Sequence, residues 1–376
     1  MQVKTWSLLL LFAVVVPSPK TLARDDASLP TVSSGRIERL RQLEFRDIPH
    51  RAVGVWTPPG YPDAAPYDTL YMHDGQMLFD AGNSWNRQEW RVDEVAAELM
   101  AAGSVRPFIV VAVANAGEAR YAEFFPQRAL EFLSTSQRER LLGMTRESGE
   151  ALFPVPPGAD AYARFLVEEL RPLVEHEYAV AKGGSHAYLM GSSMGGLISV
   201  YTLSRYLDAF AGAACLSTHW PGLFRLEDNP VPDALLNWLD ADLPQAGQHR
   251  LYFDHGDATL DALYPALQPR VDAIVAAHGY RPHIDWQTRY FPGAEHSEQA
   301  WAERLDQPLL FLFGTSTSRS LSDLKNRREN SAGRGQFLPV SQGNSRTIAQ
   351  GSGEKWTVQT DLQPIPFQVR QTPGED

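Results

Sequence analysis

The residues that could do chemistry are centred on the segment Gly191-Ser192-Ser193-Met194-Gly195. An apolar strand pattern leads into this segment and an apolar helix pattern follows it, which is the context of a G-x-S-x-G nucleophile elbow. Glycine allows the close backbone approach that such a sharp turn needs. The spacing therefore predicts that Ser193 is a nucleophile at the positive end of a helix dipole. A glycine-rich turn that only packs is the alternative interpretation.

A serine hydroxyl becomes a useful nucleophile when a histidine accepts its proton and a carboxylate orients that histidine. His296 follows the last predicted strand, where a loop can carry its imidazole over the elbow. The carboxylate is expected in the loop after the preceding strand. Asp261 is favoured there because it has enough slack to reach His296, and Asp257 is the alternative acid. Asp254 is interpreted as a turn residue.

An acyl-transfer site also needs donors for the oxyanion of its tetrahedral intermediate. One predicted donor is the backbone N–H of Met194, the residue after the nucleophile. The second is the backbone N–H of Gln76, which lies in a polar, glycine-containing turn after an early strand. The His-Gly-Gly-Gly motif of lipases is absent from that turn.

Aromatic side chains in loops at the carboxyl ends of the predicted strands are candidates for contact with substrate. They suit a sugar face or an aromatic acyl group, and core packing is the alternative. The candidates are Tyr121, Phe124, His219 and Trp220. Arg120 is interpreted as solvated surface charge, with pairing to an anionic substrate as its alternative.

Short β-branched runs alternate with helical patterns along the chain, which predicts an α/β fold with a mostly parallel central sheet and helices on both faces. The segment Tyr121–Pro157 fits neither period and is expected to form a partly helical flap beside the site. The expected strands are Ala52–Trp56, Thr69–Met72, Phe108–Ala114, Ala187–Met190, Gly212–Leu216, Arg250–Phe253 and Asp285–Tyr290. The expected helices are Val92–Ala102, Ala159–Glu177, Gly195–Tyr206, Asp233–Leu239, Asp261–His278 and Ser297–Phe313.

The chain has 376 residues, of which 43% are hydrophobic, and its formal net charge is −11. This charge argues against nucleic acid and anionic lipid surfaces as partners. One cysteine, Cys215, can form neither an internal disulfide nor a cysteine-based metal cluster. No metal ion and no organic cofactor is predicted, and the expected partner is a small-molecule or carbohydrate ester substrate. The sequence does not decide the oligomeric state.

The two ends of the chain are predicted to lie outside the fold. Lys4, an apolar run over 7–16 and the small-residue site Thr21-Leu22-Ala23 have the layout of a signal peptide over 1–23. An uncleaved anchor is the alternative, although the run is short for a membrane span. After a linker over 24–35, the hydrolase domain is expected over 36–314 and a disordered tail over 315–376. These features predict an exported protein, periplasmic or extracellular, with no stable membrane insertion after cleavage.

Four segments of the chain carry a resemblance to a known family. They are LYMHDGQMLF at 70–79, GSSMGG at 191–196, YFDHGDATLDALY at 252–264 and PGAEHSEQAW at 292–301. Over about 36–314 the chain resembles the enterochelin-esterase and esterase-D-like family of α/β-hydrolases. That family also includes feruloyl and acetylxylan esterases, S-formylglutathione hydrolases and mycolyltransferases.

The resemblance implies an α/β-hydrolase fold and a triad of Ser193, His296 and an acid in the 256–261 loop, with Gln76 and Met194 around the oxyanion. Many family members carry the acid three residues after the loop glycine, where this chain has Thr259.

Taken together, these features predict an exported serine hydrolase that cleaves carboxylic esters through an acyl-enzyme. An acyltransferase that uses the same triad is one alternative. A non-catalytic binding protein on a hydrolase fold is the other, because a fold does not secure an activity.

Overall fold

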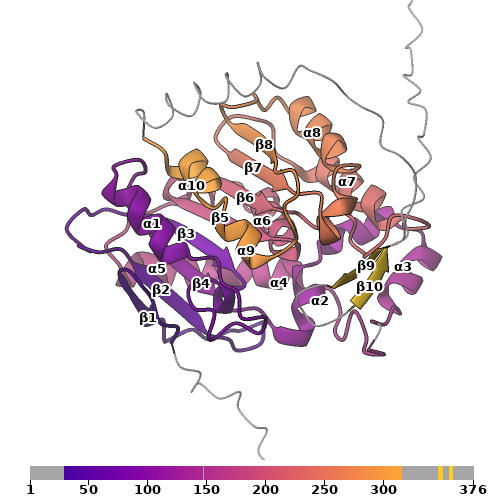
Figure 1. The fold of residues 1–376 in the computed structure, drawn as a ribbon, viewed down its shortest axis with the longest axis horizontal. Helices are drawn as coiled ribbons and strands as arrows, with labels where there is room; N and C mark the ends of the chain where they lie inside the picture. The colour runs from indigo at the N-terminus through magenta and orange to yellow at the C-terminus, as the bar shows by residue number, and fades with distance from the viewer. Residues whose placement is uncertain (1–28, 147, 316–345, 350–354, 359–376) are drawn as a thin grey trace, which may run out of the picture.

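The computed structural model describes residues 29–146 and 148–315, together with the short stretches 346–349 and 355–358 (Figure 1). Its centre is an eight-stranded sheet in the order β1-β2-β4-β3-β5-β6-β7-β8. The pairs β1–β2 and β2–β4 are antiparallel, and every other neighbouring pair is parallel. The strands are β1 (Arg36–Arg39), β2 (Val53–Thr57), β3 (Asp68–His73), β4 (Phe108–Val113), β5 (Ala187–Ser192), β6 (Gly212–Leu216), β7 (Arg250–His255) and β8 (Trp286–Tyr290).

The central strands are buried on both faces, which explains their nearly continuous apolar sequences. Along β4, Ile109 and Val111 belong to one core cluster while Phe108 and Val110 belong to the other, as the two-residue period of a strand requires. Helices cover each face (Figure 1). In front of the sheet lie α1 (Val92–Ala101), α9 (Glu298–Ala302) and α10 (Asp306–Phe313); behind it lie α4 (Ala159–Arg164), α5 (Arg171–Glu177), α6 (Met194–Arg205), α7 (Val231–Asp242) and α8 (Gln268–Ala277).

This arrangement confirms the predicted α/β-hydrolase architecture, and the seven expected strands are all present. Sequence analysis missed the edge strand β1, whose residues are only partly buried. It also joined elements that the structure separates. The helix expected over 159–177 contains a π-helical segment, η4 (Phe165–Leu170), between α4 and α5. The one expected over 261–278 is the 3-10 helix η6 (Thr259–Leu263) followed by α8, and the one expected over 297–313 is α9 and then α10.

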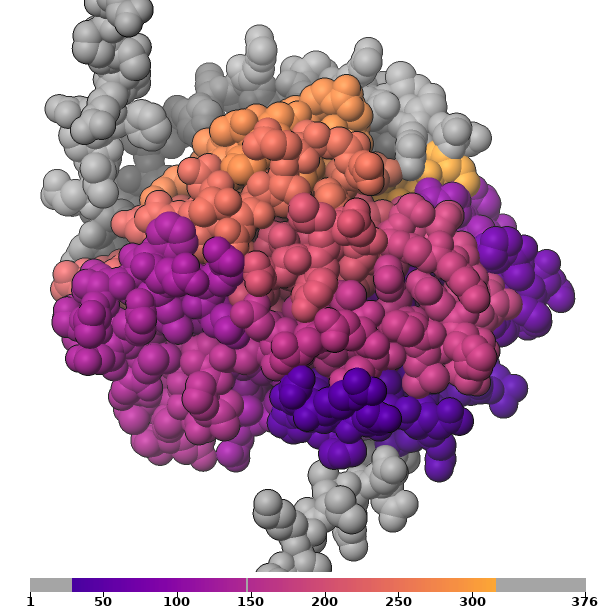
Figure 2. Space-filling model, turned by 180° about the vertical axis from the view of Figure 1, so that it is seen from behind, coloured from indigo at the N-terminus to yellow at the C-terminus, as the bar shows by residue number. Residues whose placement is uncertain are grey.

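The expected flap is partly helical, as predicted. It holds α2 (Arg120–Phe124), the 3-10 helix η3 (Gln127–Phe132) and α3 (Thr135–Leu142). The helix α3 begins at a capping box in which Ser134 and Gln137 satisfy each other's backbone N–H groups. In the view from behind, the flap forms a magenta lobe beside the helices of that face (Figure 2). Three short 3-10 helices complete the elements: η1 (Gly75–Met77), η2 (Gly117–Ala119) and η5 (Gly184–His186).

The predicted signal peptide over 1–23 and most of the predicted tail lie outside the described residues. Within the tail, β9 (Arg346–Ala349) and β10 (Lys355–Val358) pair antiparallel. Among the residues that the structure describes, no helix combines the length and apolar character that crossing a membrane requires.

Candidate active site

Ser193 sits on the turn between β5 and α6 with φ 57° and ψ −121°, a backbone conformation that L-residues rarely adopt. Gly191 explains how the turn closes, because a Cβ there would lie 2.7 Å from the backbone carbonyl carbon of Gly195. Two backbone hydrogen bonds tie the turn to the adjoining chain. The N–H of Ser193 donates to the carbonyl of Leu216 at 2.9 Å, and the N–H of His219 donates to the carbonyl of Ser193 at 3.2 Å. The serine is thus held in its strained position from β6 and the residues that follow it.

His296 is bonded to Asp261 through the ring nitrogen Nδ1, at 2.6 Å from the carboxylate Oδ1. The second oxygen of this fully buried carboxylate accepts from Ser217 Oγ at 2.6 Å and from the N–H of Gly256 at 2.7 Å. Burial alone would raise the pKa of Asp261. The hydrogen bond and charge of His296, helped by Ser217 and Gly256, outweigh burial and lower that pKa. An ionised Asp261 therefore holds Nδ1 as the donor and leaves Nε2 free to accept a proton.

The other two aspartates of this loop lie elsewhere. Asp257 accepts from the N–H of Gly293 at 2.6 Å and from the Tyr290 hydroxyl, so it fastens the turn after β8. Asp254 is not a plain turn residue: it is fully buried and pairs with Arg304 at 2.9 Å. Of the three aspartates that sequence analysis considered, the structure brings Asp261 to His296.

A layer of buried polar side chains supports this acid, and sequence analysis missed it. Ser217 Oγ, which donates to Asp261, accepts from Trp301 Nε1 at 3.0 Å and from Arg304 at 2.9 Å. Arg304 bridges to Asp254 behind it. Burial raises the pKa of Asp254 even though the charge of Arg304 opposes that shift. The acid is therefore oriented by a chain of hydrogen bonds that begins at an Asp–Arg pair.

The two predicted oxyanion donors line the same cavity as Ser193 and His296. Met194 is the first residue of α6 and Gln76 lies in the single turn of η1, so neither N–H has an acceptor one turn earlier in its helix. The turn before Gln76 is packed against β4. A Cβ on Gly75 would lie 2.6 Å from the backbone carbonyl carbon of Ala112. Glycine is thus required for this turn to approach the sheet.

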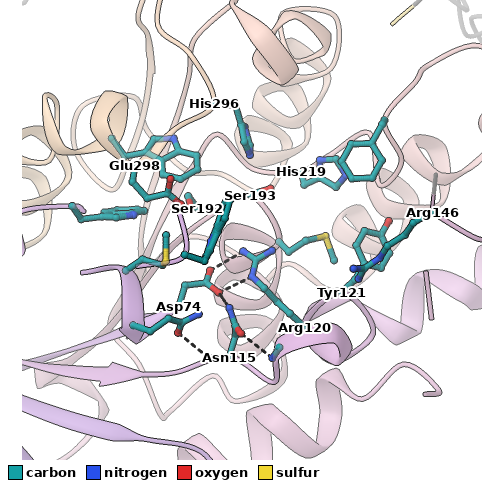
Figure 3. Close-up of a pocket in the computed structure, with 18 of the residues that line it drawn as sticks. Asp74, Asn115, Arg120, Tyr121, Arg146, Ser192, Ser193, His219, His296 and Glu298 are labelled. Carbon is teal, nitrogen blue, oxygen red and sulfur yellow. Dashed lines mark hydrogen bonds and ion pairs between the residues drawn. The ribbon is translucent and has the colours of Figure 1, made fainter. Parts of the chain in front are cut away.

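Asp74 and Arg120 form a doubly hydrogen-bonded pair beneath Ser193 (Figure 3). The bonds are 2.6 Å from Arg120 Nε and 2.7 Å from Nη2. Asn115 donates to the same carboxylate at 2.6 Å, and its backbone N–H donates to Gln76 Oε1 at 3.2 Å. Burial opposes ionisation of Asp74, but the charge and hydrogen bonds of Arg120 prevail and lower its pKa. The interpretation of Arg120 as solvated surface charge is therefore wrong.

These groups surround a cavity of about 600 Å³, a volume within the range of small-molecule sites. Tyr121, which donates to the carbonyl of Gly222, and His219 contribute to its wall, as predicted. The flap supplies Arg146 and Leu152, and α9 supplies Glu298 (Figure 3). The expected position of the flap beside the site is thereby confirmed.

Two predicted substrate contacts are contradicted by the structure. Phe124 is fully buried and packs against the rings of His73 and Tyr162, with centroids 5.5 and 5.1 Å away. Trp220 is also fully buried and donates to Gln268 at 3.2 Å. Neither side chain lines the cavity. Position in a loop near the strand ends did not reveal that these two aromatic side chains turn into the core.

A metal ion bound by the described residues would need a suitable arrangement of ligands. In the part of the chain that the structure describes, no group of three or more His, Cys, Asp or Glu is arranged to hold a metal ion. Cys215 is buried in the core, where burial raises the pKa of its thiol.

Comparisons with known proteins show the family to which this chain is similar. The model of the family described as "Putative esterase" matches residues 49–142 and 145–312. The ferri-bacillibactin esterase BesA of Bacillus subtilis is 27% identical over 177 residues, which is 46% of this chain and 56% of BesA. The chain thus spans just over half the length of that relative.

Two solved structures share the fold. A BES protein from Bacillus cereus aligns with a TM-score of 0.53 and 18% identity, over 77% of this chain and 100% of that one. An IroE-like serine hydrolase from Shewanella oneidensis aligns with a TM-score of 0.54 and 18% identity, over 74% and 79% of the two chains.

Proposed function

The chain belongs to the putative esterase family, and from that premise we propose that it is a serine hydrolase that cleaves carboxylic esters through Ser193, His296 and Asp261. The observation that carries this proposal is the 2.6 Å hydrogen bond between His296 and the buried Asp261, because His296 lines the same cavity as Ser193. An alternative in which the site only binds a ligand gives no reason for a strained serine beside an oriented imidazole.

In the first half of the reaction, Ser193 Oγ attacks the ester carbonyl while His296 Nε2 takes the hydroxyl proton. Asp261 keeps the imidazole in the required tautomer and stabilises its positive charge. The carbonyl oxygen becomes an oxyanion between the N–H groups of Gln76 and Met194. His296 then gives its proton to the leaving alcohol, and the acyl group remains on Ser193.

In the second half, His296 takes a proton from a water molecule that attacks the acyl-enzyme. The same two N–H groups hold the second oxyanion. Collapse of this intermediate breaks the bond to Ser193 Oγ, which receives the proton from His296, and the carboxylic acid leaves.

The proposal is tested with the full chain and short-chain p-nitrophenyl esters, together with a fluorophosphonate probe located by mass spectrometry. We expect hydrolysis by the wild type, covalent probe on Ser193, and a loss of at least about 10⁴-fold in kcat for Ser193→Ala. The matched control is Ser192→Ala, which removes the neighbouring hydroxyl from the same cavity wall. That variant should keep both turnover and labelling.

Other results would lead elsewhere. Labelling of Ser193 without hydrolysis, but with acyl transfer to an added alcohol, would identify the acyltransferase alternative. Folded protein with neither labelling nor turnover would contradict the proposal and favour the binding-protein alternative.

We further propose that the substrate is a small-molecule or carbohydrate ester met outside the cytoplasm. The signal-peptide layout over 1–23 supports export, and BesA, named as a ferri-bacillibactin esterase, makes siderophore esters one class to assay beside sugar esters. N-terminal sequencing of protein recovered from the exported fraction tests this part. A new terminus near residue 24 is expected, and intact chains that remain in the cytoplasm would contradict export.

A further inference from the structure

We propose that His219 Nε2 is a hydrogen-bonding site for a hydroxyl group of the substrate, so that the preferred ester carries a hydroxyl beside the scissile bond. This inference rests on the proposed esterase function and names the substrate chemistry of the same cavity.

His219 is fixed next to the nucleophile at three points. Its backbone N–H donates to the carbonyl of Ser193 at 3.2 Å, and its ring nitrogen Nδ1 is 3.2 Å from the hydroxyl of Tyr264. Phe224 packs on the imidazole with ring centroids 5.4 Å apart. The side chain lies in the cavity wall close to Ser193 (Figure 3). A substrate group that enters past Ser193 therefore meets this imidazole in a set orientation.

The other ring nitrogen has a different environment. His219 is 1% exposed, and its Nε2 has no hydrogen-bond partner among the described residues. A buried polar atom of this kind costs stability unless something in the site satisfies it. Burial also lowers the pKa of His219 to about 3, so the ring is neutral in the pH range of ester hydrolysis.

The chemistry of a neutral imidazole selects the ligand group. If Tyr264 donates to Nδ1, Nε2 carries the proton and is a donor; if Tyr264 accepts, Nε2 is an acceptor. A hydroxyl group satisfies either tautomer because it both donates and accepts. An apolar substituent leaves Nε2 unsatisfied. An anionic group gains no ion pair from this uncharged ring.

A second buried histidine shows what is specific to His219. His73 also has Nδ1 bonded to a tyrosine hydroxyl, that of Tyr162 at 2.9 Å, and its Nε2 also has no partner among the described residues. Burial lowers its pKa to about 4. However, His73 does not line the cavity. Both histidines have an Nε2 without a partner in the described part of the chain. Of the two, His219 lines the cavity in which the substrate would bind.

The test compares matched esters with and without a hydroxyl. On the acyl side the pair is p-nitrophenyl 3-hydroxybutyrate and p-nitrophenyl butyrate; on the alcohol side it is glycerol 1-monobutyrate and propyl butyrate. We expect the wild type to prefer the hydroxylated ester by about 10- to 100-fold in kcat/KM in at least one pair. His219→Phe should abolish the preference by slowing the hydroxylated ester alone. His219→Gln, which keeps a donor and an acceptor, should retain part of it.

Leu152→Ala is the matched control, since it alters the cavity wall without changing a polar group or one of the three contacts that fix His219, and it should keep the preference. Thermal unfolding of each variant confirms that the protein is folded. The inference would be overturned if, for both ester pairs, the ratio of kcat/KM between the hydroxylated and the plain ester were the same in the wild type and in both His219 variants. It would also be overturned by a His219→Phe variant that slows both members of each pair equally.

Binding to catalytically silent protein separates this inference from the proposed function. Calorimetry with Ser193→Ala should give tighter binding of the hydroxylated member of a pair, and the Ser193→Ala/His219→Phe double variant should lose that difference. If the wild type hydrolyses none of the four esters but this difference is found, the proposed function fails and the His219 site stands. Equal binding of both members of each pair overturns the His219 site whatever the hydrolysis assay gives.

Discussion

Two Asp–Arg pairs hold different parts of the site, and they differ in how they do so. The oxyanion pair, Asp74–Arg120, includes the residue at which the turn of Gln76 begins, whereas the acid-loop pair, Asp254–Arg304, is linked to the candidate acid through Ser217. Both carboxylates are buried, yet the pKa is lowered for Asp74 and raised for Asp254.

Each carboxylate accepts three hydrogen bonds, and the kind of donor explains the difference in pKa. Asp74 receives two bonds from one guanidinium and a third from Asn115. Asp254 receives one bond from Arg304, and its other donors are the Tyr252 hydroxyl and the N–H of Ser217. A bidentate Arg–carboxylate contact offsets the cost of burial more fully than a single bond does. The comparison teaches that burial alone does not set the charge of a buried aspartate.

The largest expected effect on kcat comes from substituting Asp261, the acid that the Asp254–Arg304 pair supports and that orients His296. Asp261→Asn removes the charge and presents an amide to Nδ1, which favours the wrong imidazole tautomer. We expect kcat to fall by about 10⁴-fold, the order seen when a triad aspartate is replaced by asparagine. Asp257→Asn is the control, because Asp257 only fastens the turn after β8, and its kcat should stay within a few-fold of wild type. If Asp257→Asn lowered kcat more than Asp261→Asn did, the triad acid would be Asp257 and not Asp261.

The next largest effect is expected when the Asp74–Arg120 pair is broken by substitution. Arg120→Met leaves Asp74 without its counter-charge, so we expect unfolding free energy to fall by about 2–3 kcal/mol, below the range for a wholly buried pair because the Arg120 side chain is 28% exposed. We also expect kcat to fall by about 100-fold with little change in KM, since the oxyanion is bound only during the reaction. Urea unfolding and steady-state kinetics measure the two quantities.

A compensating change sharpens this prediction. The double variant Asp74→Asn/Arg120→Met removes both charges and should recover part of the lost stability without recovering kcat. Recovery of kcat along with stability would show that the pair stabilises the fold and does not position the Gln76 turn.

Local patterns in the sequence were sufficient to propose Ser193 and His296 for the candidate site, but they did not decide which aspartate is its acid. Ser193 was identifiable because strand, glycines and helix occur together within a few residues, and His296 because it follows the last strand. The acid remained open between Asp257 and Asp261. What buries Asp261 is the 3-10 turn η6, which the sequence pattern merged into a longer helix.

The two Asp–Arg pairs were beyond sequence reasoning for a different reason. Their members are 46 and 50 positions apart, and no periodicity links a charged residue to a partner at such separation. The sheet brings them together, as it also turns Phe124 and Trp220 into the core. Long-range pairing depends on the packed fold, whereas the elbow is encoded by neighbours in the chain.

A smaller effect is expected on the pH dependence of stability, because the pKa of Asp74 is lowered and that of Asp254 is raised. Because the pKa of Asp74 is lowered from its ordinary value of 3.8, its stabilising contribution is present above that pH and is lost as the pH falls towards the folded-state pKa. The pKa of Asp254 is raised, so its contribution is present below pH 3.8 and is lost as the pH rises through the folded-state pKa.

Urea unfolding of the full chain across this acidic range measures both terms. Relative to wild type, Asp74→Asn should flatten the fall in unfolding free energy below pH 3.8. Asp254→Asn should make unfolding free energy rise more steeply with pH above 3.8. If both variants changed the slope in the same pH window and in the same direction, the contrast between the pairs would be lost.

The smallest expected effect concerns Thr259, which stands where many family members carry the acid. Its Oγ1 accepts from the backbone N–H of His296 at 2.8 Å, so it holds the histidine loop and does not contact the ring nitrogen that Asp261 orients. Thr259→Val removes this acceptor at nearly constant volume and keeps the β-branched side chain at the same positive φ of 53°. Loss of one hydrogen bond should reduce kcat by about 3- to 10-fold. Thr259→Ser keeps the hydroxyl, so its kcat should be close to that of the wild type. A loss as large as that of Asp261→Asn would instead make residue 259 part of the acid–base pair.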